Sequence, residues 1–133
     1  MAIYKNIKIT QEFLDNNPNA YFVFGDNLER SGHEGDSEVR DHPHAIGFIT
    51  KKFPDNKDES VYKPEEYSPV FFEELTKLKT IIEKRPDKIF YISRLSYGEA
   101  NKYYIWQKLI RHNLVRTVEP YNNVVFCWAD SFV

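Results

Sequence analysis

The chain has 133 residues and a formal net charge of −2, with apolar residues at 41% and charged residues at 29% of the sequence. This length fits one domain with a sizeable hydrophobic core, and this balance of residues excludes a disordered protein. The small net charge gives no overall field that would draw the chain to nucleic acid or to an anionic membrane. We therefore expect one folded domain over residues 1–133, with neither nucleic acid nor membrane as a partner.

The N-terminal part of the chain predicts two strands, separated by a short helix. Asn6–Thr10 alternates between apolar and polar residues, which favours an edge strand, and Thr10 is a suitable N-cap for a helix through Leu14. Tyr21–Phe24 is an aromatic and β-branched run typical of a buried strand. A polar loop follows, and residues 34–41 of this loop predict a short helix.

The middle of the chain predicts a strand and then a long helix. His44–Ile49 is a second buried strand, and Phe53–Tyr67 is a charged segment that we expect to be exposed. Ser68 as N-cap and Pro69 at the first helical position mark a helix start. One face of that helix carries four apolar residues at helical spacing, namely Phe71, Leu75, Leu78 and Ile82.

The last part of the chain predicts a strand, a helix and a final strand. Lys88–Ile92 is the third buried strand, a helix with Trp106 and Leu114 on its apolar face follows, and Val124–Trp128 closes the chain. Strands that alternate with helices indicate an α/β fold, here a three-layer sandwich with a mostly parallel or mixed sheet. Cys127 lies in the final strand and is predicted to be inert packing. No apolar signal segment begins the sequence, which favours the cytoplasm.

Polar residues follow three of the predicted strands, at Gly25–Asn27, Thr50–Lys52 and Ser93–Gly98. If these strands are parallel, their exits meet at the sheet edge where α/β proteins bind ligands. A lysine and an arginine beside small residues suit a phosphate-bearing ligand, whose polar edge an aspartate and an asparagine would bind. The residues predicted to bind this ligand are Gly25, Asp26, Asn27, Arg30, Gly35, Lys51, Arg94 and Gly98.

A second interpretation of these exits requires no ligand. In this alternative Asp26 and Asn27 cap a turn, while Lys51 and Arg94 pair with surface carboxylates. The sequence leaves both interpretations open.

The loop Ser31–Ser37 contains two glycines that could let backbone N–H groups surround an anion. Glu34 and Asp36 in the same loop would repel a phosphate, and could instead bind a cation. Three histidines, His33, His42 and His44, lie in or near this loop without a recognised metal-ligand spacing. We therefore predict neither a metal site nor a cofactor.

Residues Phe22–Arg30, followed by His42–Gly47 and Thr50–Lys51, resemble an uncharacterised family of small bacterial and phage proteins, a domain of unknown function. Its members carry a phrase close to FGDNL-x-R-x-G-x-GGQA and then P-N-A-I-G-I-x-TK. The similarity extends over roughly Tyr21–Leu114. More distantly, the strand that ends in Asp-Asn, the loop of small residues and the later Gly-containing exit are similar to the ADP-ribose pockets of macrodomains.

This resemblance implies a macrodomain-like fold and a nucleotide-derived ligand such as ADP-ribose, bound or hydrolysed. Asp26 is the candidate general base, by position only. The chain departs from the family where Glu34–Ser37 replaces Gly-Gly-Gln-Ala and where Ser96–Asn101 replaces a Gly-x-Gly exit. Both changes add bulk or negative charge where a phosphate would lie.

These departures support an alternative function. A phage-encoded, non-enzymatic protein could use such a scaffold to inhibit or redirect a host defence protein in the host cytoplasm. Its contact surface would then include exposed tyrosines such as Tyr62, Tyr67 and Tyr97. The sequence does not predict the oligomeric state.

Overall fold

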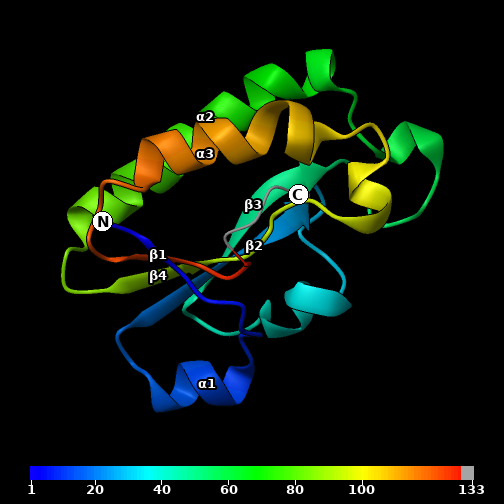
Figure 1. The fold of residues 1–133 in the computed structure, drawn as a ribbon. Helices are drawn as coiled ribbons and strands as arrows, with labels where there is room; N and C mark the ends of the chain where they lie inside the picture. Colours follow the sequence, from blue (N-terminus) through cyan, green and yellow to red (C-terminus); the bar gives the residue numbers. More distant parts are fainter. Residues whose placement is uncertain (130–133) are drawn as a thin grey trace.

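The computed structural model describes residues 1–129 and contains a five-stranded sheet with the strand order β1-β5-β4-β2-β3 (Figure 1). All neighbouring strands pair in parallel. The strands are β1 (Ile3–Tyr4), β2 (Ala20–Asn27), β3 (Ala45–Lys51), β4 (Ile89–Ile92) and β5 (Val124–Phe126). The predicted α/β fold is confirmed, with a sheet that is parallel throughout.

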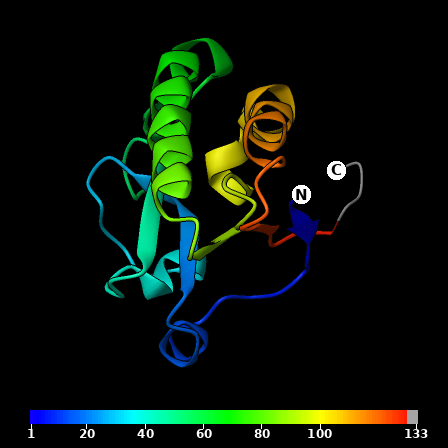
Figure 2. The same ribbon diagram turned by 90° about the vertical axis from the view of Figure 1, so that its left-hand side faces the viewer.

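Helices cover both faces of the sheet (Figure 2). The long helix α2 (Pro64–Lys84) and helix α3 (Arg111–Val118) cover one face, and the short helix α1 (Gln11–Asn16) lies on the other. The π-helical turn η4 (Trp106–Ile110) leads directly into α3. Three 3₁₀ turns complete the structure, namely η1 (Gly35–Val39), η2 (Asp58–Ser60) and η3 (Gly98–Asn101).

Alternate side chains of β2 pack into two separate cores, one on each face of the sheet. Val23 belongs to the larger core under α2 and α3, whereas Phe22 and Phe24 belong to the smaller core next to α1. A strand that is buried on both faces has no polar side, which explains its continuous apolar sequence. The three-layer arrangement follows from this double burial.

The predicted strand at Asn6–Thr10 is wrong. The first strand is β1, which pairs with β5, and residues 6–10 instead connect β1 to α1. Ile9 is buried in the smaller core, so the apolar alternation of this segment reflects packing rather than strand pairing. The predicted N-cap is confirmed, because the Thr10 side chain accepts a hydrogen bond of 3.1 Å from the Phe13 N–H.

The long helix begins at Pro64, earlier than the predicted start at Ser68. Pro64 occupies the first helical position, where its missing N–H is not needed, and the Glu66 carboxylate accepts a hydrogen bond from the N–H of Lys63. Pro69 therefore lies inside the helix, a position that the sequence rules disfavour. The earlier start brings Tyr67 into the helix, where its hydroxyl donates a 2.6 Å hydrogen bond to the carbonyl of Ile49 in β3.

Candidate functional site

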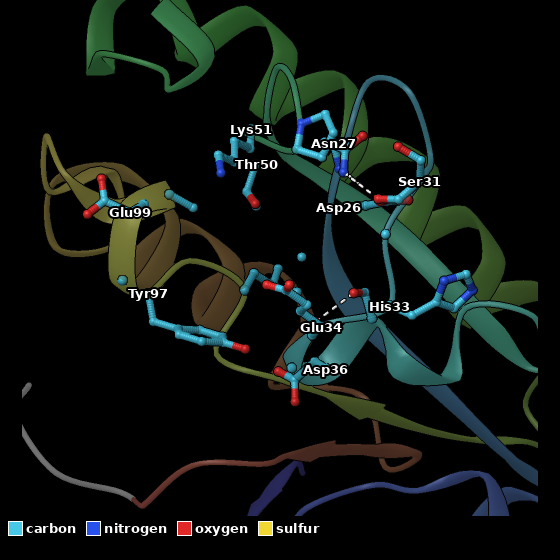
Figure 3. A pocket seen from close by; sticks show the side chains of 18 of the residues that line it. Asp26, Asn27, Ser31, His33, Glu34, Asp36, Thr50, Lys51, Tyr97 and Glu99 are labelled. Atoms are coloured by element: carbon cyan, nitrogen blue, oxygen red, sulfur yellow. Dashed lines mark hydrogen bonds between the residues drawn. The ribbon is translucent and has the colours of Figure 1, made fainter. Parts of the chain in front are cut away.

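A cavity of about 520 Å³ opens where β2 and β3 end (Figure 3). Its walls come from the two strand exits at residues 25–27 and 50–51, from the segment 95–100 after β4, and from the loop 31–37. Pro54 and Asn56 complete the lining. The ends of β2, β3 and β4 meet at one edge of the sheet because these three strands are parallel neighbours.

Gly25 lets the segment after β4 pass close to β2. A Cβ atom on Gly25 would lie 2.0 Å from the carbonyl oxygen of Leu95, which no side chain tolerates. Gly25 therefore accommodates the backbone of Leu95 rather than a ligand. The two other predicted glycines, Gly35 and Gly98, also line the cavity and adopt positive φ angles of 60° and 59°. A Cβ atom on Gly35 would also lie 2.8 Å from the hydroxyl of Tyr97.

Asp26 is buried between two arginines. Its Oδ1 lies 2.8 Å from Nη1 of Arg40, and its Oδ2 lies 3.2 Å from Nη1 of Arg30. The backbone N–H of Asn27 also donates to Oδ1, at 2.8 Å. The neighbouring strand leaves room for this cluster through Gly47, where a Cβ atom would lie 2.2 Å from Oδ2 of Asp26. Both carboxylate oxygens therefore have partners inside the protein.

The two arginines hold loops rather than line the cavity. Arg30 has a positive φ of 54° and donates a 2.9 Å hydrogen bond to the carbonyl of Gly47. Arg40 donates to the carbonyls of Ser31 and Gly32, at 2.9 and 2.8 Å, and its guanidinium lies over the Phe24 ring. Arg40 is not among the site residues predicted from the sequence, because a basic residue within a predicted short helix carries no specific signal.

Asn27 also has a structural role. Its Nδ2 donates to the carbonyl of Ser31 at 2.9 Å, and its Oδ1 accepts from the N–H of Glu29 at 3.0 Å. These hydrogen bonds form the turn that follows β2. This geometry agrees with the alternative in which Asn27 caps a turn.

Arg94 lies outside the cavity lining. Its guanidinium packs over the ring of Trp106 at 5.4 Å, its Nε donates to the Ser96 carbonyl, and burial lowers its pKa. Lys51 is the only lysine or arginine that lines the cavity within residues 1–129. Of the three cations predicted to bind the ligand, namely Arg30, Lys51 and Arg94, the structure brings only Lys51 to the cavity.

Three carboxylates without an ion-pair partner among residues 1–129 line the cavity: Glu34, Asp36 and Glu99. Figure 3 shows Lys51 on one side of the cavity, and Tyr97 with Asp36 on the opposite side. The Tyr97 side chain is accessible, since this residue is 49% exposed. Neither Glu99 nor Tyr97 was among the ligand-binding residues predicted from the sequence.

Asp36 has the most perturbed environment of these carboxylates. Burial raises its pKa, and nearby Lys8 and Ser93 lower it in part. Burial also raises the pKa of Tyr97, and the adjacent Asp36 adds to this effect. The buried hydroxyl of Ser93 lies close to Asp36 yet makes no hydrogen bond of standard geometry within the described chain. A shifted carboxyl group at a cavity wall is typical of functional sites.

Two of the three histidines are in contact, because the rings of His42 and His44 lie 5.4 Å apart and the N–H of His44 donates to Nδ1 of His42. His33 pairs with Asp41 and His42 with Asp15, both at 3.0 Å, while the ring of His44 stacks on Tyr21. Residues 1–129 contain no cluster of three or more histidine, cysteine or carboxylate side chains that could hold a metal ion.

Two of the three tyrosines proposed for a protein contact surface are buried. Tyr62 is 5% exposed and Tyr67 is 0% exposed, so the expectation that they lie at the surface is wrong. Their rings lie 5.1 Å apart in the larger core. The burial of these rings was not predicted because both residues lie in a segment with many charged side chains. Only Tyr97 is accessible, and it lies at the cavity.

Comparison with known protein families gives a match that covers most of the chain. A family of unknown function, DUF7831, matches residues 4–101. The chain belongs to the DUF7831 family. The predicted membership of a family of unknown function is thereby confirmed, and every residue that lines the cavity falls within the matched range.

The other comparisons add no relative. No curated protein and no solved structure matches this DUF7831 chain. The macrodomain likeness and the phage origin thus stay predictions. Within residues 1–129, no helix combines the length and the apolar character that crossing a bilayer requires.

Proposed function

We propose that this DUF7831 protein binds a small nucleotide-derived ligand in the cavity at the carboxyl ends of its strands. The observation that carries the proposal is the meeting of three strand exits and the loop 31–37 around about 520 Å³ of space. Ligand sites in proteins usually occupy about 300–1,000 Å³, and in parallel sheets they lie at this edge.

Different walls of the cavity suit different parts of such a ligand. Lys51 offers a positive charge to a phosphate group. The exposed ring of Tyr97 offers a face on which a base can stack. Asp36 and Glu99 offer oxygen acceptors to ribose hydroxyls or to the amino group of a base.

The geometry supports binding more directly than hydrolysis. A general base needs a free oxygen that can reach a proton of the substrate or of a water molecule. The oxygens of Asp26 instead contact Arg30, Arg40 and the N–H of Asn27. We therefore assign Asp26 to the support of the site and limit the proposal to binding.

The test is a thermal-shift and calorimetric screen of the purified chain against nucleosides, nucleotides, NAD and ADP-ribose. A ligand at about one hundred times its Kd stabilises the fold by about 2.7 kcal/mol, which shifts Tm by several degrees. Tyr97→Ala should abolish the shift. The matched control is Tyr104→Ala, because Tyr104 is 58% exposed and does not line the cavity.

A panel without any shift would refute the proposal and favour the alternative of a protein partner. Equal losses in Tyr97→Ala and Tyr104→Ala would also count against it, because only Tyr97 lies at the cavity.

A further inference from the structure

We infer that the cavity selects a nucleoside or a nucleoside monophosphate, and that it discriminates against ligands with two or more phosphate groups. This inference rests on the proposed function and deepens it. It follows from the pairing of the charged groups around the cavity.

The positive charges near the cavity are almost all engaged elsewhere. Arg30 and Arg40 pair with Asp26, and Arg94 packs over a tryptophan. Lys52 follows Lys51 directly but forms a 2.8 Å ion pair with Glu66 and does not line the cavity. Lys51 is therefore the one cation of the described chain that is available to a phosphate inside the cavity.

The negative charges, in contrast, face the cavity. Glu34, Asp36 and Glu99 line it, and no ion pair within residues 1–129 neutralises them. Lys8 comes near Asp36, but its ammonium group pairs with Glu38 at 3.4 Å. Figure 3 shows Glu34 and Asp36 across the cavity from Lys51, so a second phosphate that extends from Lys51 into the cavity approaches these two carboxylates.

The negative charge of these carboxylates disfavours the binding of a diphosphate. A carboxylate several ångströms from a phosphate in a partly buried site weakens binding by about tenfold. The same carboxylates favour groups that donate hydrogen bonds, because an ionised carboxylate only accepts them. Ribose hydroxyls and base amino groups are such donors. A ligand with a single anionic end and a donor-rich body thus fits both sides of the cavity.

The experiment is a calorimetric titration with the nucleosides of adenine, guanine, cytosine and uracil and with their mono- and diphosphates, plus ADP-ribose. For the base that binds, we expect the monophosphate to bind about tenfold more tightly than either the nucleoside or the diphosphate. Lys51→Gln should reduce the affinity for the monophosphate to that for the nucleoside and leave the nucleoside unchanged. Lys52→Gln is the matched control and should alter neither affinity.

Charge variants at two of the cavity carboxylates provide the second arm. Glu34→Gln combined with Glu99→Gln should improve diphosphate binding relative to monophosphate binding by about tenfold or more. Both residues are exposed, so the fold should persist, which circular dichroism checks. Glu73→Gln makes the same type of charge change on the outer side of α2, away from the cavity lining, and should leave the ratio unaltered.

The outcomes separate the two proposals. A diphosphate that binds the natural chain as tightly as the monophosphate would overturn the inference and leave the proposed function standing. A ratio that does not respond to the glutamate changes would overturn it as well. If neither the natural chain nor any variant binds a member of the panel, the proposed function is refuted and the inference is refuted with it.

Discussion

Removal of the Asp26 carboxylate should destabilise the whole fold. In Asp26→Ala the two arginines lose their shared counter-ion, and the N–H of Asn27 loses its acceptor. Because the Asp26 side chain is only 2% exposed, its ion pairs are weakly screened by solvent in the native fold. We expect the free energy of unfolding to fall by about 3–5 kcal/mol, the usual cost of removing one partner of a buried ion pair.

The three partners contribute unequally to this loss. Arg40 is the most buried, with 12% of its side chain exposed, but its hydrogen bonds to Ser31 and Gly32 remain, so its share is about 2–3 kcal/mol. The unpaired N–H of Asn27 adds about 1–2 kcal/mol. Arg30 is 51% exposed, so solvent screening limits its share to less than about 1 kcal/mol.

Urea denaturation followed by far-UV circular dichroism measures this loss directly. A change of 1 kcal/mol shifts Tm by about 4 °C in a domain of this size, so a thermal melt should show a decrease of about 12–20 °C. Arg30→Gln is the internal control and should cost less than about 1 kcal/mol. Asp26→Asn should fall between the two, because its amide oxygen can still accept from the N–H of Asn27 while the charge is lost.

Two results would refute this reasoning. A folded Asp26→Ala protein that loses less than about 1 kcal/mol would show that the buried cluster does not stabilise the fold. A loss in Arg30→Gln as large as that in Asp26→Ala would show that the exposed arginine, rather than Arg40, is the main partner.

Three further predictions concern single residues. Gly25→Ala should cost about 3 kcal/mol or more in a urea melt, since its Cβ would lie 2.0 Å from the Leu95 carbonyl oxygen. Gly98 has open space around it but a φ of +59°, so Gly98→Ala should lower the free energy of unfolding by only about 1 kcal/mol. Equal losses in Gly25→Ala and Gly98→Ala would show that the Leu95 carbonyl does not restrict position 25. Because the pKa of Asp36 is raised in the folded state, its contribution to stability is fully present below its usual pKa of 3.8 and is lost as the pH rises through the raised value. Asp36→Asn should therefore remove this fall of stability with pH from melts between about pH 3 and pH 8, and an unchanged pH dependence would disprove the assignment. Burial and nearby Asp36 raise the pKa of the Cys127 thiol to about 12. A disulfide reagent at about pH 8 should therefore label the native protein at least about a hundredfold more slowly than the denatured chain, and similar labelling rates would contradict the burial of this thiol.

The sequence predicts the architecture of the site better than its chemistry. Apolar runs at Tyr21–Phe24, His44–Ile49 and Lys88–Ile92 correspond to strands β2, β3 and β4, and parallel pairing alone brings their exits to one edge. That step needs only the hydrophobic pattern and the alternation of strands with helices. The start of the long helix is harder to predict, because both Pro64 and Pro69 are residues that can occupy the first position of a helix.

Side-chain partners are the part that the sequence could not supply. Asp26 pairs with Arg40 across a loop, and Arg94 finds the ring of Trp106 in a later turn. Such contacts depend on tertiary distances that no local pattern encodes. A polar residue at a strand exit is therefore equally compatible with binding a ligand and with holding a loop, and only the structure distinguishes the two roles.

This distinction determines which variants can test the function. Asp26 holds Arg40, and Arg40 holds the carbonyls of Ser31 and Gly32 at the cavity wall. A variant at Asp26 would therefore lose ligand binding even if Asp26 never touches a ligand, because the wall itself would move. Lys51 lines the cavity and forms no ion pair within residues 1–129, so its replacement changes the charge of the cavity without removing such a support. A lower monophosphate affinity in Lys51→Gln at unchanged Tm would thus implicate the cavity, whereas weaker binding in Asp26→Ala would only report the stability of its wall.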